Sequence, residues 1–293
     1  MTILNAILQG ILQGITEFLP VSSDGHLTLY QHFTKTSGEG ALFFTVMLHL
    51  GTLIAVFIAY HTLIGELLLE FCRMIGDIFT GRFSFRKLNP DRRMILMILV
   101  SLIPLLAFYF VKDFFTAIAE DSDIVVEGVL FLVTGIMLFL ADRCYKGDKT
   151  ARNMKSPDAL LIGTMQGLAA LPAVSRSGST ISMALLRGYS REYAVAFSFI
   201  MGIPAIIGAN VFELGDAVAQ GTQINWPPIL IGVAVSAIVG FFAIKLLAWM
   251  VKTDKLAIFS YYTLALGVVV IIIGAIEHMA GMNFVDLLSS MAG

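Results

Sequence analysis

The chain has 293 residues, of which 57% are apolar and 14% are charged, and its mean hydropathy is +0.85. Soluble domains carry about 25% charged residues, so this composition excludes an ordinary soluble globular protein and indicates an integral membrane protein. The formal net charge of −2 is close to zero. It indicates no charged partner, and we expect no binding of nucleic acid.

The first element is an apolar N-terminal stretch that runs directly into a polar motif, Gln13-Gly-Ile-Thr-Glu-Phe-Leu-Pro-Val-Ser-Ser-Asp-Gly-His26. The stretch lacks the basic start and the small-residue cleavage site of a removable signal peptide, so we expect it to be part of the fold. Pro20 and Gly25 interrupt the helical pattern, which favours a re-entrant helical hairpin over a continuous span. Such broken backbone at membrane depth is expected to line a cavity.

Six segments are apolar over about 20 residues, the length with which an α-helix crosses the hydrocarbon core. Lysine and arginine concentrate in the connections after the first, third and fifth of them, and the positive-inside rule places these connections in the cytoplasm. Cys72 and Cys144 fall at cytoplasmic ends, where thiols stay reduced. The acidic connection at 120–123 then lies outside. The predicted spans are residues 41–61, 94–111, 124–141, 194–212, 228–250 and 256–276.

A second polar motif, Gln166-Gly-Leu-Ala-Ala-Leu-Pro-Ala-Val-Ser-Arg-Ser-Gly-Ser179, follows the first at a distance of 153 residues, and Pro172 and Gly178 interrupt it. The same shift lays the span 41–61 on the span 194–212, and these two cross the membrane in opposite directions. A weak repeat of opposite orientation is typical of an inverted-topology fold with polar sites near the midplane.

The predicted fold is therefore an all-α integral membrane protein with two inverted repeats and six full spans. The first repeat covers residues 1–150 and the second covers residues 151–293, and each contains a re-entrant helical hairpin and three spans. The two halves form a single membrane domain.

The first motif offers metal ligands and a nucleophile. Gln13 and Glu17 lie one helical turn apart on the same face, and their oxygens suit Mg²⁺ or Ca²⁺, with substrate phosphate completing the shell. A hydrogen bond between helices is the alternative, although an intramembrane carboxylate generally serves function. Ser22, Ser23 and His26 combine hydroxyl groups with an imidazole, as a nucleophile with a general base requires, but such residues also cap helices and bond within loops.

The second motif offers an oxyanion site. Arg176 is flanked by Ser175 and Ser177, and Thr180 follows at the expected start of a helix. The guanidinium N–H donors, the hydroxyl groups and the helix N-terminus would therefore lie close together and could bind an anion. A snorkelling arginine is the alternative, but the sequence is apolar on both sides. Metal ligands, nucleophile, base and phosphate clamp together predict phosphoryl transfer.

Two other polar residues are interpreted more simply. Asp24 suits a turn or a helix N-cap, or a position that supports His26. His49 aligns with Gly202 across the repeat and is interpreted as a helix-packing histidine.

The two motifs resemble those of the undecaprenyl-pyrophosphate phosphatase family, also called bacitracin-resistance proteins. The resemblance rests on Gln13-x-x-x-Glu17, on Phe-Leu-Pro-Val-Ser-Ser-Asp-Gly-His26 and on Pro172-Ala-Val-Ser-Arg-Ser-Gly-Ser-Thr180, and it spans nearly the whole chain. It implies hydrolysis of undecaprenyl pyrophosphate to the monophosphate carrier of cell-wall synthesis, and with it bacitracin resistance. The implied location is the bacterial plasma membrane, with the active site open to the outer side.

When the family's roles are carried over by position, the resemblance implies that Ser23 is the nucleophile, or positions a nucleophilic water. It implies that His26 is the base. Gln13 and Glu17 match the family's (Glu/Gln)-x-x-x-Glu motif. The phosphate-binding set is Ser175, Arg176 and Thr180, to which Ser22 and Ser177 are added as neighbours. The chain departs from the family pattern at Asp24, where a small hydroxyl residue is usual, and at Ala173, where glycine is usual.

The implied partner is a polyprenyl pyrophosphate lipid, whose tail would lie in an apolar groove between helices. A homodimer is a possible assembly. The main alternative function is a transporter or flippase of a phosphorylated isoprenoid lipid, because inverted repeats with re-entrant loops are common in transporters.

Overall fold

The computed structural model describes residues 2–36, 41–85, 88–110, 124–144, 146–171, 173–219 and 225–292. In these ranges the regular structure is helical, and the β-structure consists of one isolated bridge between Lys149 and Tyr189. The predicted all-α class is confirmed. Pro172 and the acidic connection 120–123 lie outside the described residues.

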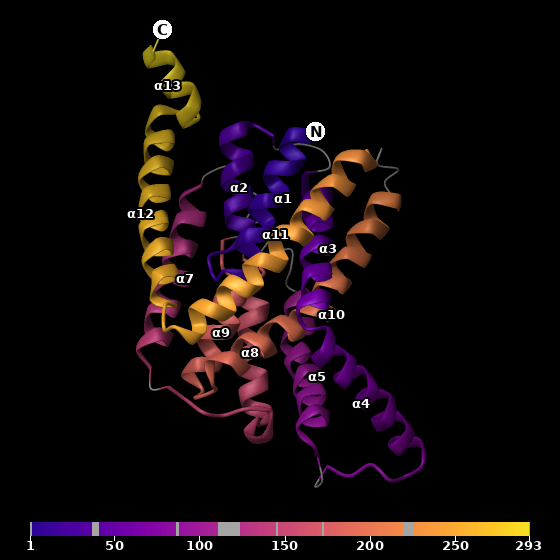
Figure 1. Ribbon diagram of the computed structural model, residues 1–293. Coiled ribbons are helices and arrows are strands. Elements are labelled where there is room, and N and C mark those ends of the chain that lie inside the picture. The colour runs from indigo at the N-terminus through magenta and orange to yellow at the C-terminus, as the bar shows by residue number, and fades with distance from the viewer. Residues whose placement is uncertain are drawn as a thin grey trace.

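Figure 1 shows the helices in their arrangement. In chain order they are α1 (Ile3–Phe18), α2 (Ser23–Thr34), α3 (Ala41–Ala59), α4 (His61–Phe79), α5 (Pro90–Tyr109), α7 (Val125–Arg143), the short 3₁₀ helix η1 (Ala151–Asn153), α8 (Ser156–Leu168), α9 (Arg176–Leu186), α10 (Arg191–Ala219), α11 (Trp226–Lys252), α12 (Ala257–Ala280) and α13 (Phe284–Ala292).

Five helices, α3, α7, α10, α11 and α12, are long and apolar enough to cross a membrane. They coincide with five of the six predicted spans, so the chain is a multi-pass membrane protein. The sixth predicted span, 94–111, overlaps α5, which is not one of these five helices, and the six-span arrangement stays a prediction.

The apolar-span pattern does not predict α4. This helix occupies most of the connection between α3 and α5, and its buried residues, Ile64, Leu67, Glu70 and Met74, recur at helical spacing on one face. Its opposite face exposes leucine side chains such as Leu68 and Leu69. Charged residues at Glu66, Glu70, Arg73 and Asp77 interrupt the apolar residues of this helix, so a search for long apolar runs does not find it.

The chain turns back at both polar motifs, as predicted. Helix α1 ends at Phe18, and Ser22 begins α2 by accepting a hydrogen bond from the Gly25 N–H at 3.3 Å. In the second motif α8 ends at Leu168, and Ser175 begins α9 by accepting from the Gly178 N–H at 3.0 Å. A serine N-cap satisfies a backbone donor that the first helical turn leaves free, so each hairpin starts its second helix in the same way.

Glycines set how closely the hairpins pack. A Cβ atom at Gly10 would lie 2.7 Å from the Gly232 carbonyl oxygen on α11. A Cβ atom at Gly163 would lie 2.0 Å from the Ser101 carbonyl oxygen on α5. Backbone cannot move aside as a flexible side chain does, so these contacts require glycine. Helix α1 therefore lies directly on α11, and α8 directly on α5.

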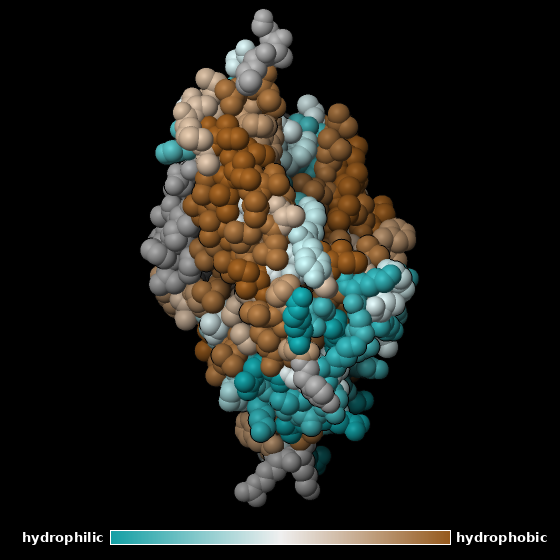
Figure 2. Space-filling model, turned by 90° about the vertical axis from the view of Figure 1, so that its left-hand side faces the viewer, coloured by the Kyte–Doolittle hydropathy of each residue, from teal (hydrophilic) through white to brown (hydrophobic). Residues whose placement is uncertain are grey.

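The outer surface of the helices is apolar. Figure 2 shows a broad hydrophobic area over the face that carries α7 and α12, with hydrophilic residues gathered toward one end. The exposed apolar side chains of these two helices include Val133, Ile136, Leu140, Ile258, Val268 and Ile272. Such a surface is stable against lipid tails, and a soluble monomer rarely exposes one of this extent.

Candidate active site

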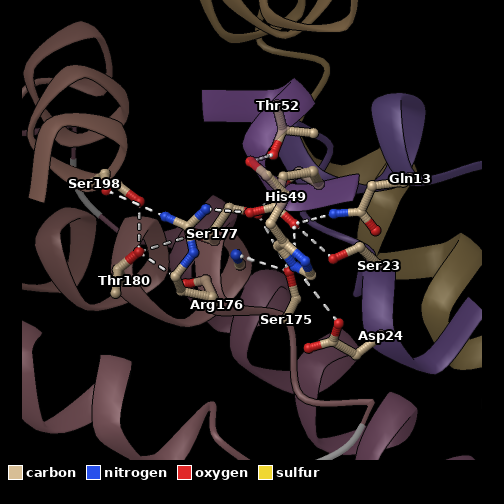
Figure 3. Close-up of polar contacts among 12 residues, drawn as sticks. Gln13, Ser23, Asp24, His49, Thr52, Ser175, Arg176, Ser177, Thr180 and Ser198 are labelled. Carbon is tan, nitrogen blue, oxygen red and sulfur yellow. Dashed lines mark hydrogen bonds and ion pairs between the residues drawn. The ribbon is translucent and has the colours of Figure 1, made fainter. Parts of the chain in front are cut away.

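Polar side chains of both motifs gather in one cluster (Figure 3), and several of them bond the buried carboxylate of Glu17. Its Oε2 atom accepts hydrogen bonds from Gln13 Nε2 at 3.0 Å and from Ser23 Oγ at 2.7 Å. Its Oε1 atom accepts a hydrogen bond from Arg176 Nη2, which also forms an ion pair with it. The Glu17 side chain is only 4% exposed. A charge buried to this degree is tolerated because it is paired and hydrogen-bonded.

The two motifs meet at this carboxylate because of where their helices begin. Ser23 is the first residue of α2, and Arg176 is the first residue of α9. Ser177 adds a second connection between the hairpins, since its hydroxyl donates to the Glu17 backbone carbonyl at 3.3 Å. Helix N-termini carry partial positive charge, so both hairpins contribute to an environment that favours an anion.

His49, on α3, also belongs to the cluster. Its Nε2 atom lies 3.4 Å from Glu17 Oε2 and 3.7 Å from Asp24 Oδ1, while its Nδ1 atom is held by the Thr45 carbonyl at 2.9 Å. The interpretation of His49 as a packing residue without chemistry missed this position. The available signal was that His49 is the sole ionisable residue of the span 41–59, and an ionisable group inside a membrane is expected to be functional.

His26 faces away from the carboxylate and toward α12. Its Nδ1 atom donates to the Ser22 carbonyl at 2.7 Å, which leaves Nε2 of the neutral ring to accept from the Tyr262 hydroxyl at 2.7 Å. The two rings are stacked, with centroids 5.7 Å apart. Ser23 thus has Glu17 as its hydrogen-bond acceptor, and the partner of His26 is Tyr262, a residue that no sequence pattern indicated.

The predicted phosphate-binding residues divide into two groups. Arg176 and Ser177 reach Glu17, as described above. Ser175 is 3.3 Å from the Ser177 hydroxyl, but its own hydroxyl oxygen caps α9. Thr180 donates to the Arg176 backbone carbonyl at 2.8 Å and lies 2.5 Å from the Ser198 hydroxyl. Thr180 therefore supports the first turn of α9 against α10.

The turn before α9 keeps a left-handed conformation without glycine. Ala173, fully buried, has φ of 61°, and Ser22 in the first motif has φ of 71°. A left-handed backbone costs an L-residue with a side chain about 1–2 kcal/mol. Alanine in place of glycine at position 173 therefore keeps the same backbone turn, but it adds strain close to Arg176.

Gln13 and Glu17 are the residues that would hold a divalent cation, although it is the Gln13 amide nitrogen that bonds the carboxylate. Gln13 Oε1 is buried and has no hydrogen-bond partner in the described part of the chain, and it lies one helical turn from the Glu17 carboxylate. Amide and carboxylate oxygens are ligands that Mg²⁺ and Ca²⁺ accept. Within the described ranges, no group of three or more His, Cys, Asp and Glu side chains is arranged to hold a metal. A cation would therefore depend on Gln13, Glu17 and oxygens from outside the chain.

These features define a class, that of multi-pass helical membrane proteins in which two helical hairpins bring a carboxylate, a serine and an arginine together. The family model described as bacitracin resistance protein BacA matches residues 6–269, and the chain belongs to this family. The resemblance found in the motifs is thereby confirmed.

Relatives in this family match over almost their whole length. An undecaprenyl-diphosphatase of Alkaliphilus metalliredigens is 42% identical over 275 residues, which cover 93% of this chain and 98% of the relative. An undecaprenyl-diphosphatase of Halothermothrix orenii is 36% identical over 279 residues, covering 94% of this chain and 100% of the relative. One from Carboxydothermus hydrogenoformans is 37% identical over 275 residues, covering 92% and 97%.

The cluster predicts a role for Gly202 on α10. A Cβ atom at this position would lie 2.3 Å from Arg176 Nη1, so Gly202→Ala would push the guanidinium away from Glu17 while the flexible arginine side chain absorbs the clash. We expect phosphate release from the lipid substrate to fall about 10- to 100-fold, with the protein still folded.

Gly208→Ala on the same helix is the matched control, because its Cβ atom would meet nothing within 4 Å. This variant is expected to retain wild-type activity. Equal activity of both variants in a phosphate-release assay would contradict the placement of Arg176.

Proposed function

We propose that this protein hydrolyses undecaprenyl pyrophosphate to undecaprenyl phosphate and inorganic phosphate, which recycles the lipid carrier of cell-wall synthesis and gives resistance to bacitracin. Membership of the family and the names of its relatives support this activity. The observation that carries the proposal is the contact of Ser23 and Arg176 with one buried carboxylate, because it joins a nucleophile, a proton acceptor and a phosphate-binding group.

In the first step, Ser23 Oγ attacks the terminal phosphorus atom. The bond from this phosphorus to the bridging oxygen breaks, and the lipid monophosphate leaves. Glu17 Oε2, at 2.7 Å from Ser23 Oγ, takes the serine proton. This geometry favours Ser23 as nucleophile with Glu17 as its acceptor.

Arg176 provides the phosphate clamp. A guanidinium has five N–H donors, and two of its nitrogens contact Glu17 and, at 3.5 Å, the Ser198 carbonyl. The remaining donors and the N-terminus of α9 would bind phosphoryl oxygens, where negative charge increases in the transition state. Arg176 also neutralises Glu17. When Arg176 binds the substrate phosphate, its interaction with the Glu17 carboxylate would weaken, and the carboxylate would then accept a proton more readily.

In the second step, water attacks the phosphoserine, and inorganic phosphate is released as Ser23 recovers its proton. The role of His26 as the base for this water stays a prediction, because its Nε2 atom bonds the Tyr262 hydroxyl on the side away from Glu17. A cation bound by Glu17 and Gln13 would supply additional neutralisation of diphosphate charge.

An inverted repeat is proposed for the whole chain. The pairs α1 and α8, α2 and α9, α3 and α10, α5 and α11, and α7 and α12 would be equivalent. With this pairing, the contact of α1 with α11 in one half corresponds to the contact of α8 with α5 in the other. The α3–α10 and α7–α12 contacts each join two equivalent helices. Gly10 and Gly163, which set the two close helix contacts, are also related by the 153-residue shift. Repeats at 1–150 and 151–293, with α5 as sixth span, follow from this pairing.

The orientation proposed is that of a plasma-membrane protein with its site reached from the outer side. The connection between α4 and α5 lies at one end of the molecule, and α2 runs from the turn after α1 toward the opposite end (Figure 1). By the positive-inside rule, the α1–α2 hairpin then opens outward. A homodimer stays a prediction.

The function is tested by phosphate release from undecaprenyl pyrophosphate with purified protein. Ser23→Ala is expected to lower the rate at least about 100-fold, and single-turnover quenching of the wild type should yield a phosphoserine at this residue. Chelation of divalent cations is expected to abolish release.

Ser101→Ala is the control, because this buried serine on α5 bonds the Ile98 carbonyl away from the cluster. It should retain wild-type activity. A fully active Ser23→Ala variant would contradict the proposed nucleophile, and an inactive but well-folded wild type that binds the lipid would favour the transporter.

The orientation is tested with the native cysteine Cys72, which is exposed on α4. After Cys144→Ser, Cys72 is the only cysteine in the chain. A membrane-impermeant maleimide should label it in inside-out vesicles and leave it unlabelled in intact cells. Lys35→Cys in a chain without Cys72 and Cys144 should give the opposite result, and labelling of Cys72 in intact cells would reverse the assignment.

A further inference from the structure

Two cavities adjoin at the basic end of the molecule, away from the Glu17 cluster. The first has a volume of about 620 Å³ and is lined mainly by α5 and the beginning of α8. The second has a volume of about 530 Å³ and is lined by residues from the 148–155 segment, by Asp158 and by Arg187. Arg93 and Lys155 line both cavities, so the two cavities are neighbours and these cations lie at the wall that they share.

The first cavity is apolar and opens toward lipid. Its walls include Met97, Val100 and Ile103 from α5 and Met154 before α8. Ile103 is 58% exposed on the outer surface of α5, so the apolar wall continues onto a face that would meet the bilayer if α5 is the proposed sixth span. A hydrocarbon chain can enter this cavity without leaving an apolar environment.

The second cavity carries an excess of positive charge. Five cations and two carboxylates line it. Arg187 is neutralised by Asp158 at 2.6 Å. No ion pair joins Arg93, Arg152 or Lys155 to a carboxylate in the described ranges, and the bond from Arg93 Nη1 to the Met154 carbonyl is long, at 3.4 Å. These cations are therefore available to an anion.

We propose that the two cavities form a binding site for an anionic glycerophospholipid of the leaflet at the basic end. The phosphodiester binds Arg93 and Lys155 at the shared wall, and an acyl chain occupies the apolar cavity along α5. Basic pockets between membrane helices on the cytoplasmic side suit lipid headgroups of this kind. A singly charged phosphodiester fits this wall, whereas a diphosphate would also meet the carboxylates of Asp148 and Asp158.

Occupation of this site would add contacts between α5 and the segment before α8, next to the place where α5 and α8 pack directly. The lipid would contact α5 and the residues just before α8, whose direct contact depends on Gly163. We therefore expect the lipid to raise the thermal stability of the protein, independently of the phosphatase chemistry at Glu17.

The test uses the full chain in phosphatidylcholine nanodiscs, with phosphatidylglycerol added as the probe and binding followed by native mass spectrometry and thermal unfolding. Wild-type protein should retain phosphatidylglycerol and unfold at a higher temperature in its presence. The double variant Arg93→Gln/Lys155→Gln should bind it about 30-fold more weakly. Lys155→Gln alone, a change at an exposed side chain that leaves the fold intact, should weaken binding about fivefold.

The matched control is Arg82→Gln/Lys252→Gln, which removes the same charge from exposed positions at the same end without altering either cavity wall. It should bind phosphatidylglycerol like the wild type. Equal losses in both double variants would overturn the proposal in favour of nonspecific attraction. Competition by inorganic phosphate, or preference for a polyprenyl monophosphate over phosphatidylglycerol, would overturn the assignment to a glycerophospholipid.

Discussion

A carboxylate buried inside an apolar helical protein has to be neutralised, and the site depends on how Glu17 meets this requirement. Taking an ion out of water costs several kcal/mol even after relaxation, so an unpaired Glu17 would not be tolerated in this position. Arg176 provides the opposite charge at Oε1, while Gln13 and Ser23 donate hydrogen bonds to Oε2. The two hairpins are consequently held together at the point where the chemistry is proposed to occur.

The same requirement would explain why the two halves of the proposed repeat differ at the centre. The 153-residue shift pairs Ser23 with Arg176, so one hairpin places a hydroxyl and the other a cation at the start of its second helix. It also pairs His49 with Gly202. The histidine lies beside Glu17, whereas the glycine leaves the space that the Arg176 guanidinium occupies. The proposed repeat would thus support an asymmetric site, with the proposed nucleophile on one side and the proposed phosphate-binding group on the other.

Sequence patterns predict the parts of this protein that local chemistry determines. Long apolar runs located α3, α7, α10, α11 and α12, and interrupted polar motifs located both hairpins. Contacts between residues far apart in the chain were harder to predict, because the local sequence does not indicate which side chain of another helix a residue meets. His49 and Tyr262 were missed for this reason, and the proximity of Ser23 and His26 in sequence did not reveal that their side chains bond different partners. Amphipathic α4 escaped because its apolar residues are not contiguous.

A double-mutant cycle on Glu17 and Arg176 tests the central claim most directly. Glu17→Gln and Arg176→Gln should each destabilise the purified protein by about 3–5 kcal/mol, because each leaves one buried charge without its partner. The combined variant removes both charges, and its free energy of unfolding should lie well above that expected from adding the two losses. Strictly additive losses would show that the two residues do not interact, and would contradict the account of how the two motifs form one site.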